Sequence, residues 1–370
     1  MAPTILSNRA LNRASLERQG LLRRVALPVT DALTHLVGLQ AQVPLNPYHA
    51  LWSRLEAFDP DELGRLMLDR QVVRIVCMRG TIHLVTASDA LVLRPMSQSV
   101  LDREMRNHRD HAPVLRDLDL APILAFGREF FADPRTIPQA RTAMAERFAD
   151  LDPAALVFAC RNNLALVQVP PRGVWGRAAQ VTLATTEGWL GRSPEIAPRI
   201  DEVVLRYLGA FGPALVADVA AWSGLQAMRE VLERLRPRLR TFRDERGREL
   251  FDLPDAPRPD PDTPAPVRFL PEYDNVLLSH SDRSRFSNGD PAIPRLWTVP
   301  SVRGSVLVEG QVRAAWTLER DPSTGGVTLT VLHAGLAKKA QASTAAEGRR
   351  LLRFLEAGAT GQEVRFVLVD

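Results

Sequence analysis

One pattern recurs along the first 256 residues of this chain: helical segments are followed by two short strands around a turn. In its first copy, apolar spacing predicts helices over 31–39, 49–57 and about 60–69. The β-branched runs 72–76 and 81–86 then flank a Met-Arg-Gly turn and predict a hairpin. Several helices followed by a hairpin give the outline of a winged helix.

The second and third copies differ in sequence from the first but keep its order. The second has predicted helices over 121–132, 136–148 and 152–161 and strands over 164–169 and 179–185. The third has helices over 202–211, 213–220 and 223–235 and strands over 239–242 and 249–252. Because the unit recurs, the sequence predicts three tandem winged-helix modules.

The chain changes character after residue 252. Residues 253–266 are dense in proline and aspartate and predict an extended linker. Glycine-punctuated strands follow, with a helix over 343–355 and a last strand over 363–369. We therefore expect a mainly α protein with β structure, ending in a β-rich domain that forms a barrel-like or curved sheet. The predicted domains are 1–112, 113–194, 195–256 and 257–370.

Composition sets limits on the partner and the compartment. The only lysines are Lys338 and Lys339, so 45 of the 47 basic residues are arginine, and the net charge is +4. Arginine suits bidentate phosphate contacts, but a GC-rich genome produces the same bias. The N-terminus lacks an apolar signal core, and no apolar run has the length of a membrane helix. We expect a cytoplasmic, nucleoid-associated protein with no membrane partner.

Searches for chemical motifs exclude most enzyme classes. The sequence has no phosphate-binding glycine loop, no nucleophile elbow and no His/Cys cluster with metal spacing. Cys77 and Cys160 are far apart and flanked by apolar residues, so we expect inert core thiols. No metal or organic cofactor is implied. The residues alone indicate a multi-domain DNA-binding protein.

Three segments in order add a more specific indication. The first is Gln40-Ala41-Gln42, at a break after an early helix. The others are Arg79-Gly80-Thr81-Ile82-His83-Leu84-Val85 and the run 269–278 with 282–285. Together they resemble the AlkZ/YcaQ group of winged-helix DNA glycosylases, whose AlkZ-like branch carries a Gln-x-Gln motif. Alanine is a smaller spacer than is usual in that motif.

The resemblance implies that Gln40 and Gln42 are catalytic. N-glycosidic hydrolysis passes through an oxocarbenium-like state and needs a water opposite the leaving base. A cationic N7-alkylpurine already leaves easily, so neutral glutamines suffice to orient the water and contact the nucleotide. The alternative is that both glutamines cap a helix beside a proline turn.

Further residues are candidates for contacts with DNA, each with a structural alternative. His83 alternates with apolar neighbours in a strand and is equally consistent with a buried structural histidine. Trp175 belongs to a loop that fits the minor groove, or it anchors that loop to the core. Glu272, Asp274 and Asn275 resemble a carboxylate cluster but also suit a strand-to-loop corner. The candidate DNA-binding set is Arg79, His83, Arg172, Trp175, Arg177, Arg283 and Arg285.

The expected function is a monofunctional DNA glycosylase that removes bulky N7-alkylguanine. Both lysines lie in the C-terminal domain, which disfavours a Schiff-base mechanism. The expected partner is duplex DNA containing alkylated purines, bound by a monomer. The resemblance also suggests unhooking of interstrand crosslinks and self-resistance to a DNA-alkylating natural product. A non-catalytic winged-helix regulator and a protein that sequesters the free genotoxin are the alternatives.

Overall fold

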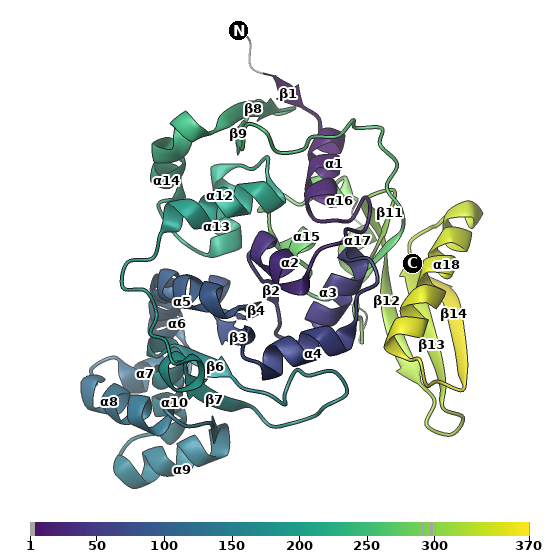
Figure 1. Ribbon diagram of the computed structural model, residues 1–370. Helices are drawn as coiled ribbons and strands as arrows, with labels where there is room; N and C mark the ends of the chain where they lie inside the picture. Colours follow the sequence, from purple (N-terminus) through teal and green to yellow (C-terminus); the bar gives the residue numbers. More distant parts are fainter. Residues whose placement is uncertain (1–3, 291, 297–298, 300, 370) are drawn as a thin grey trace.

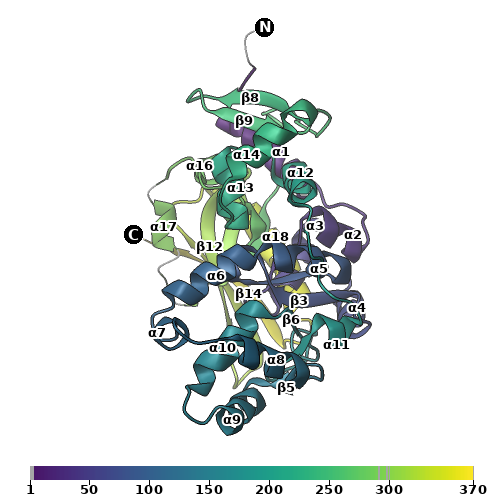
Figure 2. The same ribbon diagram turned by 90° about the vertical axis from the view of Figure 1, so that its left-hand side faces the viewer.

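A computed structural model describes residues 4–290, 292–296, 299 and 301–369 of the chain (Figures 1 and 2). It contains three β-sheets of six, three and five strands, with helices packed around them. The fold is therefore mixed α/β. No helix in the described part of the chain is long and apolar enough to cross a membrane.

The first hairpin is confirmed, and it forms the second and third strands of the six-stranded sheet. Its strands are β3 (Val72–Val76) and β4 (Ile82–Thr86). The strand order is β2-β4-β3-β6-β7-β5, so the first and second predicted modules share one sheet. The other strands are β2 (Leu39–Gln40), β5 (Arg135–Thr136), β6 (Leu166–Gln168) and β7 (Thr182–Thr185).

Of the helices before this hairpin, α4 begins at its capping residue, whereas the helix predicted over 31–39 ends at His35 and Leu39 lies in β2. Asp59 accepts a hydrogen bond from the amide of Asp61 and caps α4. Proline follows it at the first helical position, where no amide donor is needed. These helices are α1 (Asn8–Arg18), α2 (Val29–His35), α3 (Asn46–Arg54) and α4 (Pro60–Leu68).

The second part of the chain is more helical than the sequence indicated. The helices predicted over 121–132, 136–148 and 152–161 are confirmed, and Thr136 and Asp152 cap two of them. The region 87–115 had no predicted element and folds into three further helices. The helices from here to the third module are α5 (Ala87–Met96), α6 (Gln98–Asn107), α7 (Ala112–Leu115), α8 (Ala121–Phe130), α9 (Ile137–Arg147), α10 (Pro153–Asn163) and α11 (Thr186–Leu190).

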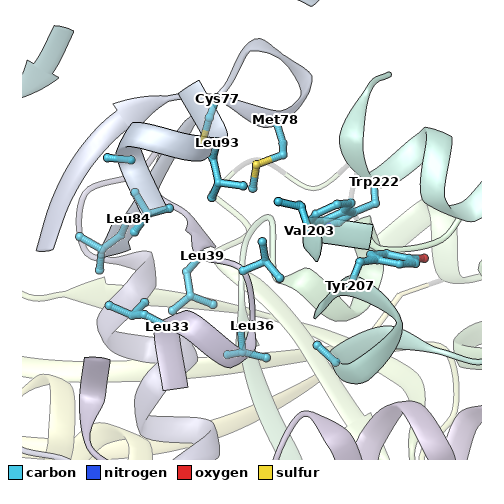
Figure 3. Packing of buried hydrophobic residues seen from close by; sticks show 14 of the residues in the cluster. Leu33, Leu36, Leu39, Cys77, Met78, Leu84, Leu93, Val203, Tyr207 and Trp222 are labelled. Carbon is cyan, nitrogen blue, oxygen red and sulfur yellow. The ribbon is translucent and has the colours of Figure 1, made fainter. Parts of the chain in front are cut away.

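The third predicted module packs directly onto the first. Figure 3 shows Leu36 and Leu39 in one apolar cluster with Val203, Tyr207 and Trp222. Burying both surfaces in one core holds the modules together. The third module comprises α12 (Ile200–Phe211), α13 (Val216–Ser223), α14 (Met228–Leu235), β8 (Arg240–Asp244) and β9 (Glu249–Asp252). The N-terminal strand β1 (Ile5–Leu6) pairs with β8 in parallel.

The C-terminal sheet is open, so the barrel-like closure expected from the sequence is wrong. Its order is β10-β11-β12-β13-β14, with β10 and β14 at opposite edges. The first four strands are antiparallel, and β14 joins β13 in parallel after the crossover helix α18. The strands are β10 (Arg268–Pro271), β11 (Gly304–Val308), β12 (Gln311–Arg320), β13 (Gly326–His333) and β14 (Gly361–Leu368).

Helices pack on both faces of this open sheet and bury its apolar side chains. Phe269 faces a cluster that includes Leu351 and Leu352 of α18, whereas Leu270 faces a cluster that includes Leu16 of α1. Alternate residues thus enter separate cores, as the strand period requires. The remaining helices are α15 (Asn275–Leu278), α16 (Ser284–Ser287), α17 (Ala292–Leu296) and α18 (Lys338–Leu355).

Candidate active site

The Gln-x-Gln segment begins at the end of strand β2, and Ala41 and Gln42 follow that strand. After α2, Val37 and Gly38 both adopt left-handed backbone conformations (φ 53° and 87°) and reverse the chain. A Cβ at Gly38 would lie 2.5 Å from a methyl carbon of Val85, so the turn requires glycine. Gln40 then occupies β2 and pairs with His83 of β4. The alternative role in capping a helix is therefore wrong for Gln40.

Gln40 is buried and held by an arginine. Arg79 Nη2 donates to Gln40 Oε1 at 2.9 Å, and Arg79 Nη1 donates to the carbonyl of Trp222. The contact with Arg79 therefore uses the oxygen of the Gln40 side-chain amide and not the N–H groups of that amide. Arg79 is placed for this contact by a left-handed backbone (φ 58°) in the turn between β3 and β4.

His83 completes this cluster as a neutral side chain. Its Nδ1 lies 3.0 Å from the carbonyl oxygen of Thr81, which assigns the ring proton to Nδ1. Its Nε2, 3.3 Å from Arg79 Nη2, then accepts. Burial, with a smaller contribution from the charge of Arg79, lowers the pKa of His83 to about 3. Burial also lowers the pKa of Arg79 to about 10, so Arg79 remains the one charged member of this cluster near neutral pH.

Gln42 has a different environment from Gln40. Its side chain is exposed, and Oε1 accepts only a long hydrogen bond of 3.4 Å from the amide of Ile82. The backbone between the two glutamines is fixed, because the amide of Ala41 donates to the carbonyl of Ile82 at 2.7 Å. One glutamine is therefore constrained and the other is free to contact a ligand.

The backbone of this segment is supported by a residue that sequence reasoning missed. Arg74, 1% exposed in the middle of β3, donates from Nη2 to the carbonyl of Ala41 at 2.9 Å. Its Nε and Nη1 have no hydrogen-bond partner among the residues that the structure describes. Burial lowers the pKa of Arg74 to about 10. A signal was present in the sequence, since an arginine interrupts the apolar run Val-Val-Arg-Ile-Val.

The C-terminal segment that carries the resemblance also reaches this site. Asn275 Nδ2 donates to the carbonyl of Gly38 at 2.9 Å, and Asn46 Nδ2 donates to the carbonyl of Glu272 at 2.6 Å. Asp274 is buried in a bidentate ion pair with Arg54. Asp274 and Asn275 are therefore committed to internal contacts in this structure, whereas Glu272 is partly exposed.

The arginines expected to bind DNA fall into two groups. Arg177 and Arg283 are exposed, and Arg172 is partly exposed while donating to the carbonyl of Ala179 at 3.0 Å. Arg285 is 4% exposed and donates to Ser15 Oγ and to the carbonyl of Pro213. Its guanidinium group is therefore used inside the protein and is not available to DNA in this structure. Trp175 packs against Tyr48 with ring centroids 5.0 Å apart, which favours its anchoring role.

One cavity adjoins the segment that follows Gln42, and a second cavity shares a lining residue with the first. The larger has a volume of about 690 Å³ and is lined by residues 43–46, by the loop 172–179 and by the C-terminal sheet. The smaller, of about 510 Å³, lies over residues 271–273 and includes Arg283. Glu272 lines both cavities. The larger volume lies in the range of sites that hold drug-sized ligands.

The site offers neutral amides and arginines for its chemistry. In the described part of the chain, no group of three or more His, Cys, Asp and Glu side chains is placed to hold a metal ion. Cys77 and Cys160 are buried and unpaired, and burial raises the pKa of each thiol to about 12. Lys338 and Lys339 are exposed on α18, in the C-terminal domain.

Comparison with known proteins defines the class. The fold is similar to that of the Streptomyces sahachiroi DNA glycosylase AlkZ, with a TM-score of 0.77 and 20% sequence identity over 98% of this chain and 100% of that chain. No curated protein sequence matched the chain. The sequence profile of the AlkZ-like DNA glycosylase family matches residues 33–354, and the chain therefore belongs to this family. It is a DNA glycosylase, as the three motif segments indicated.

Proposed function

We propose that this enzyme is a monofunctional glycosylase that hydrolyses the N-glycosidic bond of N7-alkylguanine in duplex DNA. The observation that carries the proposal is that a constrained Gln40 and an exposed Gln42 lie two residues apart, next to a segment that lines a cavity of about 690 Å³. Neither glutamine has a hydrogen bond to a carboxylate or a lysine among the described residues. Such a site suits a lesion that leaves readily without a strong general acid.

The two glutamines take different roles in this proposal. Gln42 orients a water molecule through its exposed amide, while the N–H groups of Gln40, polarised by Arg79 at Oε1, contact the lesion nucleotide. The water oxygen bonds to C1′, the C1′–N9 bond breaks, and its electron pair neutralises the cationic base. The proton from the water passes to solvent. No covalent intermediate forms, consistent with a site whose described hydrogen bonds involve no lysine.

The remaining predictions from the sequence belong to this proposal. We propose that the three helix-and-hairpin units act as winged-helix modules that hold duplex DNA through arginine–phosphate contacts, with the enzyme acting as a cytoplasmic monomer. Bulky adducts are the preferred substrates, because the larger cavity lies next to the catalytic segment. Crosslink unhooking and self-resistance to a genotoxin follow if such adducts are accepted.

The test is base release from duplex DNA carrying N7-methylguanine or a bulky N7-alkylguanine. Wild type releases the base, and folded Gln40→Ala and Gln42→Ala variants release it at least about tenfold more slowly, equivalent to about 1.4 kcal/mol of barrier. Tight DNA binding with no release from either adduct would overturn the substrate assignment. It would favour a DNA-binding regulator; stoichiometric binding of free genotoxin would favour sequestration.

A further inference from the structure

An exposed tyrosine lies alongside the catalytic segment. The segment 272–275 is tied to both flanks of the Gln-x-Gln motif: Asn275 binds the carbonyl of Gly38, and Asn46 binds the carbonyl of Glu272. Both hydrogen bonds are buried or partly buried and join residues more than 200 positions apart. Tyr273 therefore lies in a short segment that is hydrogen-bonded to both flanks of the motif.

The backbone at Tyr273 is held in a conformation that it would not adopt alone. Its φ angle is 61°, in the left-handed region that disfavours residues with a large side chain. The next residue, Asp274, is fixed by two hydrogen bonds to the buried Arg54 and caps α15. The surrounding contacts thus impose the strain, and such strain concentrates at functional sites.

The strained conformation presents the ring to solvent. Tyr273 is 42% exposed, although both of its flanking segments are anchored in the interior. It lines the smaller cavity with Arg283, and its neighbour Glu272 lines both this cavity and the larger one. A hydrogen bond with the carboxylate of Glu272 raises the pKa of Tyr273, so the phenol is neutral near neutral pH. A neutral aromatic ring is thus exposed at the smaller cavity, which Arg283 also lines.

We propose that Tyr273 stacks on a nucleobase at the lesion and holds the alkylated nucleotide against Gln40 and Gln42. An aromatic ring binds any base through its face, without reading sequence, which suits an enzyme that acts on damage in any context. The exposed Arg283 at the rim of the smaller cavity supplies a phosphate contact beside the stacked base. The inference rests on the proposed glycosylase reaction and adds a lesion-contacting residue to it.

Three substitutions distinguish the effect of the aromatic ring of Tyr273 from the effects of its hydroxyl group and of its apolar bulk. Tyr273→Phe keeps the aromatic face, Tyr273→Leu keeps apolar bulk without that face, and Ile196→Ala, in an exposed loop, controls for loss of surface apolar area. Single-turnover base release is measured beside the fluorescence of 2-aminopurine placed opposite a stable abasic-site analogue. Thermal unfolding establishes that each variant is folded.

The expected result is a loss of about tenfold in the release rate for Tyr273→Leu, with Tyr273→Phe and Ile196→Ala close to wild type. The fluorescence change on binding should persist in Tyr273→Phe and be lost in Tyr273→Leu. A Tyr273→Leu variant with the wild-type rate and the wild-type fluorescence change overturns the inference but leaves the glycosylase intact. If wild type releases no base, the proposed reaction fails, and the fluorescence comparison still decides whether Tyr273 stacks.

Discussion

Arg79 and Gln40 lie 39 residues apart in the chain, and the Arg79 guanidinium Nη2 donates to Gln40 Oε1 at 2.9 Å. The same guanidinium group binds the carbonyl of Trp222, which belongs to α13. A partly buried cation therefore links a proposed catalytic glutamine to the third helix-and-hairpin unit. Removing it leaves three acceptors of buried residues, Gln40 Oε1, the Trp222 carbonyl and His83 Nε2, without this donor, which costs about 1–3 kcal/mol for each.

Replacing this arginine should reduce catalysis more than DNA binding. We expect Arg79→Met to lower the single-turnover rate of base release about tenfold or more, because Gln40 loses the contact that fixes its amide. The dissociation constant for undamaged DNA should change less, because Arg79 is directed inward. Parallel rate and binding titrations measure the two effects. A variant that loses DNA affinity but keeps its maximal rate would show instead that Arg79 contacts DNA.

Arg74 provides a second test of how the Gln-x-Gln backbone is held. Arg74→Met removes the donor to the Ala41 carbonyl, and Arg94→Met removes a similarly buried arginine that donates to the carbonyls of Asn162 and Leu164. Burial lowers the pKa of both arginines to about 10, so they are matched in environment. Both variants should lose stability, about 1–3 kcal/mol in urea unfolding.

Only Arg74→Met should also lower the rate of base release in the folded protein, by about tenfold. Equal rates for the two variants would mean that Arg74 has a general structural role. Restoration of the rate in Arg74→Lys would attribute the effect to the lost donor, because lysine retains a charged N–H group.

The rate of base release should be nearly independent of pH between about 6 and 8. The pKa of His83 lies at about 3 and that of Arg79 at about 10, so neither group of the cluster titrates in this interval. The rate is measured on a substrate whose spontaneous depurination is subtracted at each pH. A profile that rises or falls through a pKa near 6.5 would require a titrating histidine at the site.

Stability, in contrast, should depend on pH below 6.5. Burial lowers the pKa of His49 to about 4 and that of His83 to about 3, from an ordinary value of 6.5. Below pH 6.5 the unfolded chain binds protons that the folded protein does not, so stability falls as the pH falls toward these values. The unfolding temperature should therefore be lower at pH 5 than at pH 7.5, by thermal scans in buffers of equal ionic strength. An unchanged unfolding temperature would contradict the burial of both rings.

Arg283 and Arg285 should respond differently to replacement by alanine. Arg283 is exposed, so its loss should weaken DNA binding and reduce the slope of log affinity against log salt by about 1. Arg285 is buried and lies 3.8 Å from the Asp218 carboxylate, so its loss should cost about 3–5 kcal/mol of stability. Salt titrations and urea unfolding of both variants check this contrast, and equal losses of affinity in two stable proteins would refute it.

The sequence determined the local elements well, since their signals lie within a few residues. The β-branched runs around Met78-Arg79-Gly80 form the predicted hairpin, and the caps Asp59, Thr136 and Asp152 begin helices as predicted. Capping and turn formation depend on neighbouring residues, so one chain is enough to read them. The motif Gln40-Ala41-Gln42 was informative only through its resemblance to a family, because its residues alone also suited a helix end.

Tertiary structure decided which side chains meet and which are free. Gly38 and Asn275 are 237 positions apart, Asn46 and Glu272 are 226 apart, and no local pattern links either pair. Similarly, Arg283 and Arg285 lie in one short polar segment, yet packing exposes one and buries the other. The open C-terminal sheet follows from helices that cover both of its faces, which strand periodicity does not encode. Residue spacing specifies local backbone structure, whereas burial depends on the elements that pack against it from elsewhere in the chain.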